Sequence, residues 1–154
     1  MRKRVSIARA LKEKNRVAGK LAKARELVKE ENSKDTKHPR GIDVRATYDL
    51  AQMLKATLID IKAAIAVANS PIVAKIIELD ELKSEIAFLN GLNVKEGLFE
   101  ETSYGGSVVR EITAVLRKPD VLEEIARLQK RADELQDELD EFNASTRIEI
   151  EVLE

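Results

Sequence analysis

The stretch T-S-Y-G-G-S, residues 102–107, holds the side chains best suited to contact a small ligand. Gly105 and Gly106 form the only glycine pair in the chain. Paired glycines let a backbone approach a ligand closely or present its N–H groups to an anion. Tyr104 can stack on a base, and hydroxyl side chains lie on both sides of it. The stretch is either a turn that leads into a strand or the lining of a pocket for a small anion such as a nucleotide.

Arginines extend this candidate site, because the planar guanidinium suits bidentate recognition of phosphate. Arg110 and Arg117 follow the stretch closely in sequence, whereas Arg40 and Arg45 would have to come from elsewhere in the fold or from a neighbouring subunit. The candidate ligand-binding residues are Ser103, Tyr104, Gly105, Gly106, Ser107, Arg110, Arg117, Arg40 and Arg45.

Residues that commonly carry catalysis or bind metals are scarce. His38 is the only histidine, and its context K-H-P-R-G is typical of a solvated loop. The chain has no cysteine, which excludes thiol catalysis, disulfides and cysteine-ligated metals. Neither a metal-ligand spacing of His, Asp and Glu nor a phosphate-loop, nucleophile-elbow or dinucleotide pattern is present. We therefore expect no enzymatic activity, no cofactor and no metal.

The charges are distributed unevenly along the chain, although the net charge is only −1. From Met1 to Lys29, eleven Lys and Arg stand against two acidic residues, a net charge of +9. From Asp120 to Glu154, four Lys and Arg stand against twelve Asp and Glu, a net charge of −8. A basic N-terminal helix can bind nucleic acid in a salt-dependent way. The alternative, which we favour because the two charges nearly match, is that it lies beside the acidic C-terminal helix of the same chain or of a neighbour. No nucleic-acid partner is then expected.

Hydrophobic periodicity predicts four helices, over residues 3–31, 44–68, 71–90 and 119–142. In N-S-P, Ser70 is the expected N-cap and Pro71 the first helical residue of the third helix. The first helix has a narrow, alanine-rich stripe that lets another backbone come close: Ala10, Val17, Leu21, Ala24 and Val28. The second has a wider apolar face: Leu50, Met53, Leu54, Thr57, Leu58, Ile61, Ala64, Ile65 and Ala68. The third presents Ile72, Ile76, Leu79, Leu82, Ile86 and Leu89, and the fourth a near-heptad seam of Leu122, Ile125, Leu128, Ala132, Leu135, Leu139 and Phe142.

Two strands are expected near the C-terminus. Residues 108–117 are rich in β-branched side chains, and residues 146–152 alternate strictly between apolar and polar. We expect these two strands to pair with each other. Two strands alone are marginal in water, so they should lie on helices or join strands of a second subunit. The predicted fold is a single mainly α domain, residues 1–154, with long antiparallel helices, this small two-stranded β element and an oligomeric assembly.

No membrane segment or secretion signal is expected. No stretch approaches the roughly 18–20 consecutive apolar residues of a membrane helix. The start, M-R-K-R-V-S-I-A-R-A, lacks the uninterrupted apolar region of a signal peptide. We expect a cytoplasmic protein with no membrane partner.

Three segments carry a resemblance to a known family: I-I-E-L-D-E-L-K-S-E-I-A-F-L-N (76–90), V-V-R-E-I-T (108–113) and L-Q-K-R-A-D-E-L-Q-D-E-L-D-E-F-N-A-S-T (128–146). In this layout the chain resembles the septicolysin-like family of small bacterial helical proteins. The resemblance implies a homo-oligomer, a hexamer, and offers no catalytic residues to carry over.

Two functions fit these observations. The first is a non-enzymatic homo-oligomeric binding protein, bacterial or phage-encoded, whose inter-subunit pockets hold a small anionic ligand and sequester a nucleotide signal. The second is a purely structural scaffold whose helical seams assemble a particle. A ligand that raises the melting temperature would separate them, since only a binding protein is stabilised by it.

Overall fold

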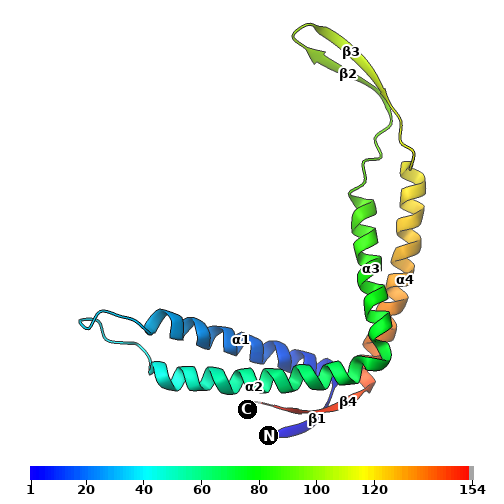
Figure 1. Cartoon of the computed structure of the whole chain (residues 1–154). Helices are drawn as coiled ribbons and strands as arrows, with labels where there is room; N and C mark the ends of the chain where they lie inside the picture. Colours follow the sequence, from blue (N-terminus) through cyan, green and yellow to red (C-terminus); the bar gives the residue numbers. More distant parts are fainter. Residues whose placement is uncertain (153–154) are drawn as a thin grey trace. The chain divides into compact units, whose positions relative to one another are not determined.

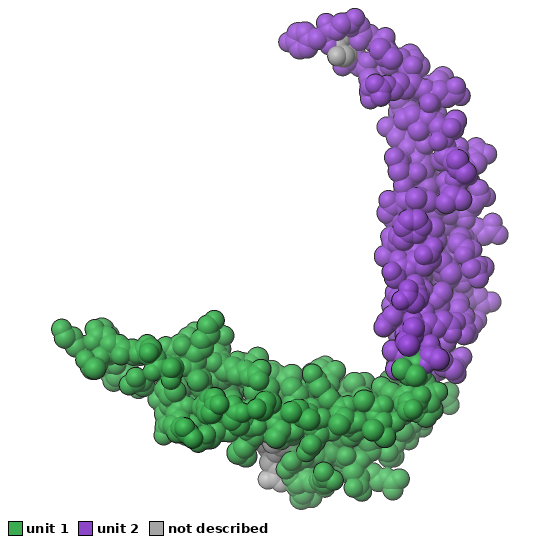
Figure 2. All heavy atoms as spheres, viewed as in Figure 1, with its two compact units in different colours: residues 1–73, 140–154 green, residues 74–139 purple. Residues whose placement is uncertain are grey.

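The computed structural model describes residues 1–152, and the fold is mainly helical, as the sequence predicts (Figure 1). The elements in chain order are β1 (Arg2–Ser6), α1 (Ile7–Glu31), α2 (Val44–Asn69), the 3-10 helix η1 (Ser70–Ile72), α3 (Val73–Asn90), β2 (Gly97–Ser103), β3 (Gly106–Ile112), α4 (Lys118–Ser145) and β4 (Arg147–Glu151). They belong to two compact units (Figure 2). Unit 1 comprises Met1–Val73 and Asp140–Glu154, and unit 2 comprises Ala74–Leu139.

Unit 1 is built on a hairpin of α1 and α2. The small side chains Ala10 and Ala24 are buried on α1, so Cα atoms of the two helices come within 8 Å of each other. This confirms the prediction that the alanine-rich stripe admits a close neighbour. Buried residues of α1 are Ile7, Ala10, Val17, Leu21 and Ala24, and those of α2 are Ala51, Leu54, Thr57, Ile61 and Ile65.

Side chains cap the ends of this helical hairpin. The Ser6 hydroxyl accepts a hydrogen bond from the Arg9 N–H (3.3 Å), and the Asp43 carboxylate accepts one from the Ala46 N–H (2.9 Å). Arg40 donates from Nε to the Glu31 carbonyl (3.0 Å), at the last turn of α1. Each bond satisfies a backbone group that a helix end leaves without an internal partner.

A two-stranded sheet joins the two ends of the chain beside the α1–α2 hairpin (Figure 1). β1 and β4 are antiparallel, with Val5 opposite Ile148 and Arg4 opposite Glu149. Val5 and Ile150 are buried in the same cluster as the helical core, and Ile148 and Val152 pack against that cluster. The predicted inward face of the tail is therefore confirmed.

Two predictions about these strands were wrong. The first helix was expected from residue 3, yet Arg2–Ser6 is a strand, because R-K-R-V-S pairs with the alternating tail. Residues 108–117 were expected to pair with the tail. Instead β3 ends at Ile112 and pairs with β2, a strand that the sequence pattern did not predict. A turn of only Tyr104 and Gly105 separates β2 from β3, and so short a loop favours pairing of the strands it joins.

Unit 2 contains an antiparallel pair of helices, α3 and α4. Leu89, Val121 and Leu128 form a buried cluster that Leu82, Ile86 and Ile125 extend. Leu122 was expected in this seam but is largely exposed, and Val121 takes its place. The seam then runs Val121, Ile125, Leu128, Ala132, Leu135 and Leu139, a strict alternation of steps of four and three.

Ion pairs flank the helical seam of unit 2. Lys75 on α3 bonds to the Glu138 carboxylate on α4, and this bond lowers the pKa of Glu138. Arg131 Nε donates a hydrogen bond to the Glu78 carboxylate at 2.8 Å, and this bond raises the pKa of the guanidinium. Because these groups are exposed, each pair adds little to the stability of unit 2.

The structure differs from the prediction where α2 leads into α3 along the chain. Ser70 was expected to cap the third helix at its N-terminus, but it is the C-cap of α2 and the first residue of η1, which follows α2 directly. Pro71 lies in the first turn of η1, where no N–H is needed. The helical run Val44–Asn90 is long and apolar enough to cross a membrane by length and composition alone. That is weak evidence, since helices of soluble proteins pass the same test.

Within unit 1 the basic first helix α1 packs on α2. Within unit 2 the acidic helix α4 forms ion pairs with α3. Opposite charges of the two chain ends do meet in the β1–β4 sheet, where Arg2 lies opposite Glu151 and Arg4 opposite Glu149. Cross-strand pairs of opposite charge favour this register.

Candidate functional site

The stretch T-S-Y-G-G-S forms the tip of the β2–β3 hairpin. Ser103 pairs with Gly106 at the ends of the two strands, and Tyr104 and Gly105 make the turn. Gly106 has a φ of +130°, a conformation that residues with a side chain rarely adopt. The glycine pair therefore has a structural use in the turn. The side chain of Ser103 lies outside the described part of the structure.

Tyr104 and the two glycines of the tip face open space. Tyr104 is fully exposed, and a Cβ added at Gly105 or Gly106 would meet no atom within 4 Å. The Ser107 hydroxyl donates to the Glu100 carboxylate on the facing strand. A pocket at this tip would need a second surface to close it.

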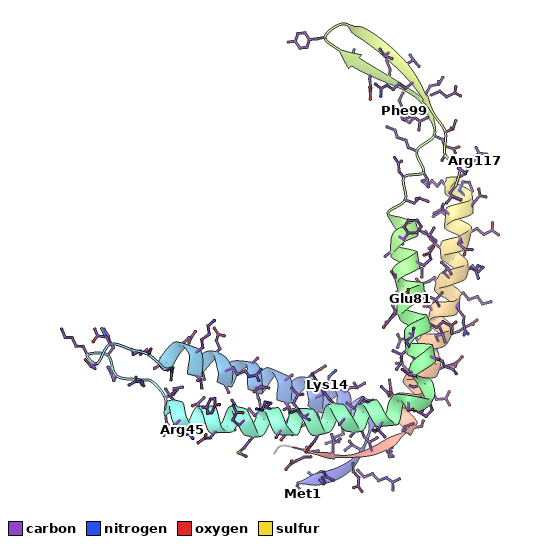
Figure 3. The ribbon with its side chains drawn as sticks, viewed as in Figure 1. Met1, Lys14, Arg45, Glu81, Phe99 and Arg117 are labelled. Carbon is purple, nitrogen blue, oxygen red and sulfur yellow. The ribbon has the colours of Figure 1, made fainter. Side chains whose placement is uncertain are left out.

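The four candidate arginines already have partners near them. In unit 2, Arg110 lies 3.2 Å from Glu101, and Arg117, which is labelled in Figure 3, forms an ion pair with Glu96 at 3.2 Å. In unit 1, Arg40 donates to carbonyls of Glu31 and Asn32, and Arg45 lies 3.4 Å from Asp49. Arg40 therefore caps the C-terminal end of α1. The pairs of Arg110 and Arg117 are exposed and hence weak, so both guanidinium groups can exchange their partner for another anion.

The lone histidine of the sequence lies in a loop of unit 1. His38 is exposed in the loop after α1, with Nδ1 3.8 Å from Asp35. Among residues 1–152, no group of three or more His, Cys, Asp or Glu is arranged to hold a metal ion. The pKa shifts are those of exposed ion pairs: Lys34 and the Gly41 N–H lower the pKa of Glu31, and Arg127 lowers that of Glu124. Catalytic sites instead shift pKa values by burial and by like charges.

A groove between α1 and α2 of unit 1 combines apolar residues with two lysines. Its volume is about 510 Å³, within the range of small-ligand sites. Lys20, Lys23, Ala24, Leu27, Thr47, Leu50 and Leu54 line it. Lys20 and Lys23 form no ion pair within the described chain. We call this feature the α1–α2 groove; it combines an apolar floor with a positive rim.

Sequence reasoning missed the groove because it placed Leu50, which lines the groove, and nearby Met53 in the core. Leu50 and Met53 were expected to be buried, yet Met53 is 66% exposed and Leu50 is about half exposed. The narrow stripe of α1 covers only part of the wide apolar face of α2, and the excess stays at the surface. The signal in the sequence was that the apolar stripe of α2 is wider than the apolar stripe of α1.

The β2–β3 hairpin also exposes apolar side chains, on both faces. On one face, Phe99 lies under the Lys95 ammonium, which is 3.8 Å from the ring centroid. On the other face, Leu98 and Val109 are exposed beside Glu100 and Glu111. Side chains of opposite strands alternate on this second face, with Leu98 opposite Glu111 and Glu100 opposite Val109. We call these four residues the acidic hairpin face.

Comparison of the chain with protein-family models, with curated proteins and with solved structures finds no match. The resemblance to the septicolysin-like family is neither supported nor contradicted by this result. Arguments about function therefore rest on the geometry of the chain itself.

Proposed function

We propose that the chain is a non-enzymatic assembly protein that functions as a homo-oligomer. The observation that carries the proposal is the β2–β3 hairpin, whose Leu98, Val108 and Val109 are exposed on its two faces. A lone two-stranded hairpin is marginally stable in water, and contiguous exposed apolar side chains mark interaction surfaces. A second subunit would cover these side chains.

The α2 surface supports the same proposal. Leu50, Met53, Ile59 and Val67 are all exposed along one helix of unit 1. Scattered exposed apolar residues are normal, but here they accompany an exposed hairpin and a groove. This geometry favours the structural function over the ligand-binding one.

Met53→Glu is expected to weaken assembly without unfolding the subunit. The side chain is 66% exposed in one chain, so its replacement removes little intramolecular packing. Burying a Met in an interface contributes about 1.5–3 kcal/mol, and a charge there reverses that gain. Multi-angle light scattering should show a lower mass for Met53→Glu than for the unaltered protein at equal concentration, with unchanged helical circular dichroism.

The matched control is Ala22→Glu, which adds the same charge at an exposed position of α1 outside the groove lining. Its mass should equal that of the unaltered protein. A monomeric mass for the unaltered protein at all concentrations would contradict the proposed function itself.

A second function, binding of a small anion such as a nucleotide between subunits, is favoured by the exposure of the Arg110–Glu101 and Arg117–Glu96 pairs. Thermal melting against a panel of nucleotides and inorganic phosphate tests it. At a hundredfold excess over Kd a ligand stabilises its protein by about 2.7 kcal/mol. Arg110→Met should remove about 1.5–3 kcal/mol of that binding, because a charge-assisted hydrogen bond is lost. Arg25→Met on α1 is the control, and absence of any shift across the panel would reject this function.

A further inference from the structure

The α1–α2 groove and the acidic hairpin face are complementary in both charge and polarity. The groove has an apolar floor that includes Leu50, with Lys20 and Lys23 at its rim. The acidic hairpin face presents Leu98 and Val109 together with two carboxylates. Two apolar and two acidic side chains on one face of a strand pair thus match the apolar floor and the two lysines of the groove.

The net charges of the two units follow the same pattern. Unit 1 has eighteen Lys and Arg against thirteen Asp and Glu, a net charge of +5. Unit 2 has nine Lys and Arg against fifteen Asp and Glu, a net charge of −6. Patches of opposite potential steer association and fix its register. The charges therefore favour contact of unit 1 in one copy with unit 2 in another.

Contacts between identical patches are disfavoured. Two acidic hairpin faces would bring Glu100 and Glu111 against the same carboxylates of a second copy, and two grooves would bring lysines together. Like charges placed opposite each other at an interface cost several kcal/mol. A heterologous, head-to-tail contact avoids this repulsion in both patches.

We propose that the acidic hairpin face of one copy docks in the α1–α2 groove of a second copy. In this contact Leu98 and Val109 lie on the apolar floor of the groove, and the carboxylates of Glu100 and Glu111 meet the two rim lysines. The docking rests on the proposed homo-oligomeric function and identifies its interface. It supplies the β2–β3 hairpin with the packing surface that two strands require.

Because the chain has no cysteine, single cysteines can map the contact without background. A chain carrying Leu50→Cys is mixed with a tagged chain carrying Val109→Cys, equilibrated under reducing conditions and then oxidised. Non-reducing electrophoresis should show the mixed disulfide as the main product, in excess over either product of two identical chains. Ala22→Cys replaces Leu50→Cys in the control mixture and should give little mixed product.

Reversal of charge provides a second readout that leaves the apolar contacts intact. Lys23→Glu and Glu111→Lys should each weaken association by about tenfold or more, since each places like charges together. Both side chains are exposed and form no ion pair in the described chain, so the subunit should fold normally. The double variant should recover most of the lost affinity, measured by sedimentation equilibrium.

The outcomes separate this docking from the proposed function. An oligomeric mass combined with a predominant Val109–Val109 disulfide, or with equal linkage to Ala22→Cys, overturns the docking and leaves self-assembly standing. Failure of the double charge variant to recover affinity also overturns it. A monomeric mass for the unaltered protein overturns both.

Discussion

Ile61→Ala is expected to lower the free energy of unfolding of unit 1 by about 2–5 kcal/mol. Ile61 lies in the middle of α2, is 0% exposed, and packs in the cluster shared by α1, α2 and the β1–β4 sheet. Truncation to alanine removes buried methyl and methylene groups and leaves a cavity at the site where all three elements meet. Urea unfolding followed by far-ultraviolet circular dichroism measures the loss.

Ile59→Ala is the matched control, with the same chemical change two residues away on the same helix. Ile59 is 58% exposed, so its truncation should change the free energy of unfolding by no more than about 0.5 kcal/mol. Equal losses from the two substitutions would show that the buried face of α2 is not the one described.

Leu135→Ala is expected to destabilise unit 2 by a similar amount, about 2–5 kcal/mol. Leu135 is 0% exposed at the centre of the α4 seam, and other residues of that seam, Val121 and Leu128, form a buried cluster with Leu89 of α3. Loss of this side chain should separate the unfolding of unit 2 from that of unit 1 in a thermal melt. Differential scanning calorimetry would then show a lower transition for unit 2.

Leu122→Ala on the same helix controls for helix propensity and residue type. Leu122 is 54% exposed, so its substitution should be nearly silent. This pair also distinguishes the observed seam through Val121 from the seam through Leu122 that the sequence suggested. If Leu122→Ala lowers the free energy of unfolding more than Leu135→Ala does, the seam runs through Leu122 and not through Val121.

The assembly proposal gives a physical reason for the composition of the chain. α2 carries more apolar surface than α1 can cover, and the β2–β3 hairpin buries almost none of its valines. Exposed apolar surface of this kind is a liability for an isolated subunit. Assembly with other copies would turn it into stabilising interface.

Local patterns in the sequence determined most of the secondary structure. The heptad steps of residues 125–139, the alanine-rich stripe of residues 10–24 and the alternation of residues 147–151 all appear in the structure as predicted. Each pattern reports which side chains share a face, and that depends only on the geometry of one helix or one strand. The turn at T-S-Y-G-G-S was predictable for the same reason, since Gly106 supplies a positive φ.

Only the tertiary structure decided which elements pair. β4 could have paired with residues 108–117 by pattern alone, but it pairs with β1 at the opposite end of the chain. Likewise, Leu50 and Met53 belong to an apolar face of α2, yet they are exposed because α1 is too narrow to cover them. Periodicity shows that a face is apolar but not what covers it, because the covering element is chosen by long-range packing that local patterns do not encode. The α1–α2 groove follows from that incomplete cover.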